Sequence, residues 1–143
     1  MKKLIALILA ASCSMHAHSE ISEKDHLRFQ KWRANTHHEL INCSVYYEFI
    51  SLRMTTDNPA VSKKSHLIGD ILLEQAIALG LDEQVTAARY QMAIDKIIPY
   101  HKMLGGLSVV MQENDKKCVD IVNGRVLREA KWWGDYYEKM TAK

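Results

Sequence analysis

The residues of this chain with the greatest potential for chemistry are its seven histidines and three cysteines. His66 and Asp70 are four residues apart, so on a helix they share one face, as two ligands of a metal site must. A third ligand would have to come from another helix. We expect a surface pair, and keep His66 and Asp70 as candidate metal ligands.

His101 lies among the apolar or aromatic residues Tyr90, Ile94, Ile97 and Leu104 at helical spacing. A histidine on such a face is usually a core residue with one hydrogen bond, and that is our expectation. The alternative is a haem carrier, because histidine and methionine both serve as axial ligands of haem. Its second ligand would be one of three methionines, Met92, Met103 or Met111.

The sequence has none of the common motifs for catalysis or phosphate binding. It lacks a Gly-x-Ser-x-Gly elbow, a Walker loop, Gly-x-Gly-x-x-Gly, Cys-x-x-Cys and Cys-x-x-Cys-His. His37-His38-Glu39 lacks the second histidine of His-Glu-x-x-His, and Glu48 is expected to be solvated. We therefore predict that the protein is not an enzyme, has no catalytic residue and needs no cofactor.

Residues 1–17 have the pattern of a secretory signal peptide. Lys2 and Lys3 precede the short apolar run 4–11, and small residues follow it. The predicted cleavage site is after Ala17, with Ser14 as an alternative. The protein is therefore expected in the periplasm or secreted.

Two residues near the predicted cleavage site, Cys13 and His18, suggest further possibilities for the N-terminus of the exported protein. Cys13 follows Ala10-Ala11-Ser12, which is similar to a lipoprotein box, so lipidation at Cys13 is an alternative. Cleavage after Ala17 would leave His18 as the first residue, whose free amine and imidazole could chelate copper. His18 is therefore another candidate metal ligand.

Removal of the signal peptide leaves two cysteines, Cys43 and Cys118. An even pair in an exported chain predicts one disulfide. The bond would close a loop of 75 residues, for which the chain-entropy model gives about 4 to 5 kcal/mol. Two free buried thiols are the alternative.

Apolar periodicity predicts an all-α fold, and its strongest element is a helix over residues 23–54. Its apolar stripe, with Cys43 in the middle, repeats at steps of three and four and consists of Phe29, Trp32, Thr36, Leu40, Cys43, Tyr47, Ile50 and Met54. Ser22 is its expected N-cap.

Further capping and breaking residues predict four more helices. Asn58 with Pro59 begins the second, which Gly80 ends, and Asp82 begins the third. The third is apolar over a wide arc and is expected at the centre of the bundle, with a kink or an early end near Ile98 caused by Pro99. The last two helices are expected over residues 107–122 and 125–140. Residues 18–143 should thus form one antiparallel bundle of four to five helices.

The last helix carries the candidate interaction surface. Its core stripe is expected to be Val126, Ala130, Trp133, Tyr137 and Met140. Trp132 and Tyr136 lie together on the flank of that stripe, because they are four residues apart. Either the first helix covers them near Trp32, or they stay partly exposed and anchor a partner.

The pattern Cys43-x-x-Tyr46-Tyr47, the later Cys118 and the last helix rich in tyrosine and tryptophan resemble a group of proteins. The group consists of small uncharacterised exported helical proteins of Gram-negative bacteria. The resemblance covers most of the mature chain and implies export and the cysteine pairing, but no activity.

Charge and size complete the functional expectation. The formal net charge of +2 falls to zero without Lys2 and Lys3, so there is no electrostatic footprint for nucleic acid. We expect a non-catalytic binding module, of the inhibitor, immunity or adaptor type, that recognises another periplasmic protein. The alternative is a metal- or haem-binding carrier with histidine and methionine ligands.

Overall fold

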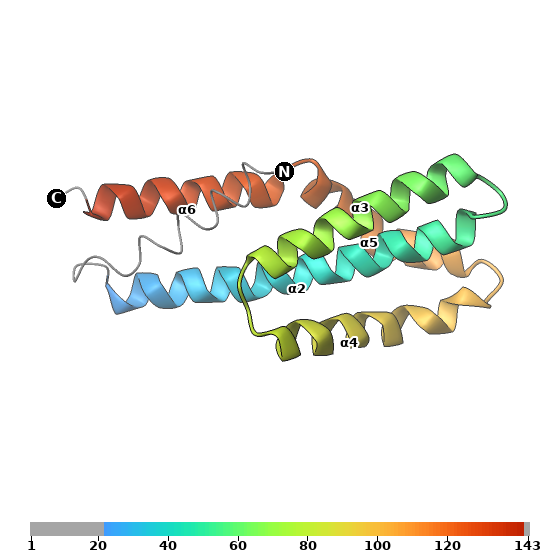
Figure 1. Cartoon of the computed structure of the whole chain (residues 1–143), viewed down its shortest axis with the longest axis horizontal. Helices are drawn as coiled ribbons and strands as arrows, with labels where there is room; N and C mark the ends of the chain where they lie inside the picture. The colour runs from blue at the N-terminus through green and yellow to red at the C-terminus, as the bar shows by residue number, and fades with distance from the viewer. Residues whose placement is uncertain (1–21, 142–143) are drawn as a thin grey trace.

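A computed structural model describes residues 22–141, which form five α-helices and no strand (Figure 1). The helices are α2 (Glu23–Met54), α3 (Pro59–Ala78), α4 (Glu83–His101), α5 (Gly106–Val122) and α6 (Arg125–Thr141). The predicted all-α fold is confirmed. None of these five helices is long and apolar enough to cross a membrane. The predicted signal peptide and the candidate residues Cys13 and His18 lie outside the described residues.

Helix α2 is the central element of the fold. It begins at the predicted N-cap, where the Ser22 hydroxyl accepts a hydrogen bond from the Asp25 amide at 3.2 Å. Its 32 residues make a rod roughly 48 Å long. From residue 40 to residue 51, only Asn42 and Glu48 are not buried. A helix with so little exposed circumference must be surrounded by others.

The central position predicted for α4 is wrong. Ala93 is the one buried residue of this helix, whereas Val85, Met92 and Ile98 are exposed. One side of α4 packs on its neighbours and no helix covers the other, so its wide apolar arc is only partly used. Pro99 does not end the helix, which continues to His101 although proline cannot donate a hydrogen bond to the Asp95 carbonyl.

Side-chain contacts give the direction of α4. The His37 ring lies 3.0 Å from the Thr86 hydroxyl near the start of α4. Arg53 donates a hydrogen bond to the His101 carbonyl at the end of α4, at 2.7 Å. Residue numbers increase together along both helices, so α4 runs parallel to α2, and α3 between them in sequence runs antiparallel to both.

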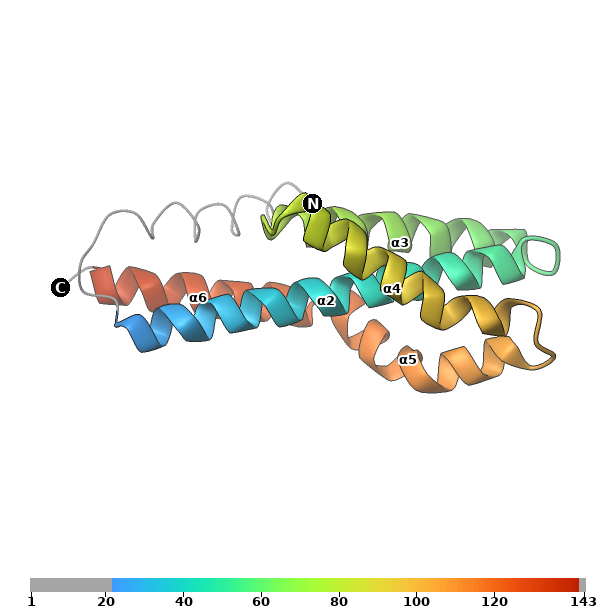
Figure 2. The ribbon, with the colours of Figure 1, turned by 90° about the horizontal axis from the view of Figure 1, so that it is seen from below.

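Helices α5 and α6 follow one another along α2 in the antiparallel direction (Figures 1 and 2). Cys118 of α5 bonds to Cys43, and Tyr137 of α6 packs on Phe29, near the start of α2. Gly124, at a φ of +92°, provides the turn between them. The result is a four-helix bundle of α3, α4, α5 and the C-terminal half of α2, and a two-helix arm made of residues 23–36 and α6.

Two links fix α5 on α2. The predicted disulfide is present, with α-carbons of Cys43 and Cys118 at 5.3 Å and both residues buried. The buried Tyr46 hydroxyl donates to Asp115 at 3.1 Å. Burial and the Asp115 carboxylate raise the pKa of Tyr46, so this phenol stays protonated and remains the donor.

The arm has its own aromatic core. Phe29, Trp133 and Tyr137 are buried, and Trp32 and Tyr136 pack against them. The Phe29 ring centroid lies 5.4 Å from that of Trp133 and 5.5 Å from that of Tyr137, both with edge-to-face geometry. Large rings fill the space that a two-helix contact would otherwise leave open to water.

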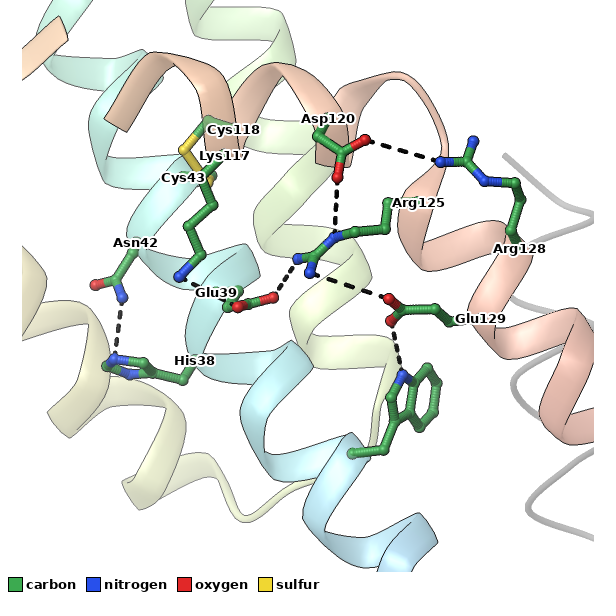
Figure 3. Close-up of polar contacts among 11 residues, drawn as sticks. His38, Glu39, Asn42, Cys43, Lys117, Cys118, Asp120, Arg125, Arg128 and Glu129 are labelled. Carbon is green, nitrogen blue, oxygen red and sulfur yellow. Dashed lines mark hydrogen bonds and ion pairs between the residues drawn. A yellow bond between two sulfur atoms is a disulfide. The ribbon is translucent and has the colours of Figure 1, made fainter. Parts of the chain in front are cut away.

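A polar network lies where the arm meets the bundle (Figure 3). Arg125 donates a hydrogen bond to Glu39, and Lys117 lies 3.1 Å from the same carboxylate. The Trp32 indole donates to Glu129 at 2.8 Å. Burial would raise the pKa of Glu39, but the hydrogen bonds from Arg125 and Lys117 lower it, so Glu39 is ionised. The network fixes the start of α6 beside the disulfide.

His37 is completely buried, which its polar neighbours in the sequence do not indicate. Its Nδ1 atom accepts a hydrogen bond from Arg89 at 2.9 Å, so its Nε2–H donates to Thr86. Burial and the nearby charge of Arg89 lower the pKa of His37 to about 4. A neutral His37 therefore holds the start of α4 on α2.

Loss of the disulfide should destabilise the protein strongly. Cys43→Ser and Cys118→Ser should each lower the free energy of unfolding by up to about 4 kcal/mol, because each frees the same loop in the unfolded chain. The double variant should add less than about 1 kcal/mol, since both changes remove one bond. Urea denaturation measures this, with reduced wild-type protein as the control, and additive single effects would contradict the prediction.

The buried His37 should make stability depend on pH. Its folded pKa lies below the unfolded value of about 6.5, so the unfolded chain binds the extra proton and stability falls as pH decreases from about 6.5 to 4. Between pH 7 and pH 5, protonation linked to His37 should lower the free energy of unfolding by about 2 kcal/mol.

Urea denaturation at the two pH values compares wild-type protein with His37→Gln, which keeps one donor and one acceptor. The variant should lose this part of the pH dependence. His26→Gln, on the exposed surface of α2, is the matched control. An unchanged pH dependence in His37→Gln would refute the assignment.

Candidate functional site

An apolar groove of about 630 Å³ lies between α2 and α4. Its lining residues are Val45, Glu48, Phe49 and Leu52 of α2, Tyr90, Ile94, Ile97, Ile98, Pro99 and His101 of α4, and Lys102. The volume is in the range of ligand pockets, which are also mainly apolar with few polar groups. Sequence periodicity did not reveal the groove, although the wide apolar arc of α4 was its signal.

The groove exists because α3 and α4 diverge. They are joined by the short turn at residues 79–82 and separate toward their other ends, so that part of α2 stays uncovered between them (Figure 1). Leu52 and Ile98 are consequently 63% and 57% exposed. Apolar side chains with this exposure contribute little to folding and are available for contacts with another molecule.

Polar groups occupy the margins of the groove. On the α3 side, Glu48 accepts a hydrogen bond from His66, and Lys102 lies beyond the end of α4. Burial and the carboxylates of Glu48 and Asp70 raise the pKa of Tyr90, so its phenol is uncharged. A ligand would thus meet an apolar floor with an anionic margin and a cationic end.

The structure brings the candidate pair His66 and Asp70 together and adds Glu48 from α2. His66 Nδ1 lies 2.8 Å from Glu48, and its Nε2 lies 3.6 Å from Asp70. The hydrogen bond that His66 donates to Glu48 and the charges of both carboxylates raise the pKa of His66. Their ligand atoms all lie within 4.8 Å of one another, so the ion-pair cluster of Glu48, His66 and Asp70 has the composition of a metal site. The binding of a metal to these candidate ligands stays a prediction.

Glu48 is less solvated than predicted because α3 approaches α2 closely at Gly69. A Cβ atom on Gly69 would lie 2.7 Å from a Glu48 carboxylate oxygen. With glycine at this position the Glu48 carboxylate lies between the helices and reaches His66.

The core position expected for His101 is wrong. Its side chain is exposed at the end of α4, with its ring 6.2 Å from that of Phe49. The three candidate partner ligands, Met92, Met103 and Met111, are also exposed, and none of them lines the groove. The described residues therefore offer no buried histidine–methionine pair for a haem.

Trp132 and Tyr136 lie together on α6 as the sequence predicts. Their rings stack at 5.4 Å, and Trp132 is 57% exposed while Tyr136 is half-buried. Trp32 does not cover Trp132, because its ring packs on Phe29 and Trp133 on the inner side of the arm. The role of this surface in binding a partner stays a prediction.

The two neighbouring tryptophans of α6 should differ in their effect on stability. Trp132→Ala should cost less than about 1 kcal/mol, because the ring is mainly in water. Trp133→Ala should cost about 3 to 5 kcal/mol, because it leaves a cavity in the aromatic core. Chemical denaturation of both variants measures the difference, and an equal loss would mean that Trp132 belongs to the core.

Comparison with known proteins adds no assignment. No family model matches the chain, and no curated protein or solved structure matches it. The resemblance to small exported helical proteins therefore stays an expectation.

Proposed function

We propose that the protein is a non-catalytic binding module whose α2–α4 groove holds an amphipathic helix of another exported protein. The observation that carries the proposal is the groove itself, in which apolar side chains of two helices are left without cover. Its polar groups lie at the margins, where they can fix the orientation of a bound partner without interrupting the apolar floor. Export remains part of the proposal, and the buried disulfide supports it because such bonds persist in oxidising compartments.

The shape of the groove favours a helix as the occupant. Val45, Phe49 and Leu52 are spaced i, i+4 and i+7 on α2, and the lining residues of α4 have the same period. From Tyr90 to His101 the groove extends for roughly 16 Å, or three helical turns. An amphipathic helix in this position would insert its own side chains at i, i+3 or i+4, and i+7.

Charge sets a preferred orientation for such a helix. Glu48 and Asp70 lie on the α3 side, and Arg53 and Lys102 lie at the end where α2 and α4 finish. A partner helix with basic side chains toward the first pair and acidic side chains toward the second would be complementary. The partner is thus expected to be amphipathic and to carry both signs of charge.

Site-specific photo-crosslinking in cells that express the protein tests the proposal. A photoreactive amino acid at position 98 should crosslink to a protein of defined mass. The same amino acid at position 77 of α3 should not, although Ile77 is 59% exposed and so matches Ile98. Leu52→Glu should lower the yield at position 98 at least about tenfold, because it places an unpaired carboxylate in an apolar interface.

Leu52→Glu should leave the free energy of unfolding within about 0.5 kcal/mol of wild type, since its side chain is mainly in water. The loss of crosslinking would then be a loss of binding. Equal crosslinking at positions 98 and 77, or a yield that Leu52→Glu does not change, would contradict the proposal. A crosslink to lipid alone at position 98 would also contradict it.

A further inference from the structure

A cluster of exposed apolar side chains lies at the end of the bundle where α2 and α4 finish. Leu104, in the connection between α4 and α5, is 99% exposed, and Met103, Ile98 and Leu52 are each more than half exposed. Figure 1 shows this connection and the turn between α2 and α3 at the same end. We call this end the apolar tip. Single exposed apolar residues are common on protein surfaces and need no explanation, whereas four at one end of the bundle form a group.

The backbone holds Leu104 outward. Gly105 has a φ of +74°, which favours glycine, and a Cβ atom on Gly106 would lie 2.1 Å from the Tyr100 carbonyl oxygen. The connection therefore folds tightly against α4, and Met103 and Leu104 lie on its outer side. Neither residue lines the groove, so the apolar tip extends beyond the groove.

The same end has an excess of positive charge. Residues 51–64 and 98–112 contain one carboxylate, Asp57, and four cationic side chains, Arg53, Lys63, Lys64 and Lys102. None of these four makes an ion pair within residues 22–141. At the junction with the arm, by contrast, Arg125 has carboxylate neighbours. The charge of the apolar tip is therefore not compensated within the described part of the chain.

We propose that the apolar tip docks on a surface of anionic lipid, with Leu104 and Met103 inserted among the acyl chains and the four cationic side chains against the headgroups. Apolar side chains on a projecting turn suit insertion into a fluid interface, because they need no complementary pocket in a partner. Basic residues around them add attraction to anionic headgroups. Nucleic acid would match the cations but not the exposed leucine and methionine side chains.

Docking in this way would bring the end of the groove near the lipid surface, because Leu52 and Ile98 belong to both. The proposal does not depend on the function of the groove, since Leu104 is outside it. The two surfaces can therefore be tested separately.

Vesicle flotation tests the docking. The purified mature protein should float with vesicles of phosphatidylethanolamine and phosphatidylglycerol, and much less with phosphatidylcholine vesicles, and added salt should weaken the binding. Lys102→Glu should reduce the partition constant at least about fivefold, and Leu104→Glu should reduce it at least as much. Two exposed positions distant from the apolar tip provide matched controls, Lys131→Glu and Ile77→Glu, which should bind like wild type.

Tryptophan quenching locates the inserted residue. Trp32, Trp132 and Trp133 all belong to the arm, and Trp32 is roughly 33 Å along α2 from Met54. Brominated anionic vesicles should therefore quench the added tryptophan in Leu104→Trp and leave the fluorescence of wild-type protein almost unchanged. Circular dichroism of each variant verifies that it is folded.

Several results would overturn the proposal. They are wild-type protein that does not float with anionic vesicles, floating of Leu104→Glu equal to wild type, and equal losses in Ile77→Glu and Leu104→Glu. If position 98 crosslinks to a protein but the protein does not bind anionic vesicles, the docking proposal fails and the groove proposal stands. If the protein binds vesicles as expected but position 98 gives no protein crosslink, the groove proposal fails and the docking proposal stands.

Discussion

Helix α2 is roughly 48 Å long, and each of the other helices has between 17 and 20 residues. No single partner can cover such a rod. Helices α3 and α4 cover its C-terminal half, and α5 and α6 divide one side of it between them. This difference in length produces two cores, one surrounded by four helices and one enclosed by only two. The polar network of Glu39 and Arg125 lies where one changes to the other.

The same constraint explains why the two cores differ in composition. In the bundle, the small residues Gly69 and Ser44 let α3 approach α2 closely, and the Ser51 and Ser62 hydroxyls lie 3.2 Å apart. Helix α4 cannot approach in the same way. Hydrogen bonds hold it to α2 near each of its ends, at His37 and at Arg53, and the wider contact between them leaves the groove. In the arm, aromatic rings fill the corresponding space.

The fold class and most helix boundaries could be predicted because they depend on local chemistry. Ser22, Asn58 and Asp82 each cap a helix through their own side chain, and such a bond forms wherever the next residues are helical. The pairing of Cys43 with Cys118 was predictable because only these two cysteines remain once the expected signal peptide is removed. Export, which is part of the same reasoning, depends on residues outside the described range.

The arrangement of helices and the candidate site were not predictable to the same degree. Periodicity shows which face of a helix is apolar, but not whether a neighbouring helix covers that face. The wide apolar arc of α4 therefore predicted a position at the centre of the bundle, whereas in the structure part of that arc lines an open groove. His37 looked like a surface residue because its partners Arg89 and Thr86 are distant in sequence. Glu48 joins His66 for the same reason. Buried polar contacts between helices are a property of the packing, which one sequence shows poorly.

Exposure alone does not distinguish a binding surface from ordinary surface, because more than half of a protein surface is typically apolar. Leu27, Leu67 and Ile77 are as exposed as the residues of the groove, yet none of them lines it. Leu52 and Ile98 differ from these residues because they line the groove. Leu104 differs because it lies on the tight turn before Gly105, at an end of the bundle with unpaired cations. The groove and the apolar tip both lie toward the C-terminal ends of α2 and α4, where neighbouring helices cover α2 incompletely. The functional surfaces inferred for this protein thus follow from the arrangement that leaves its longest helix partly uncovered.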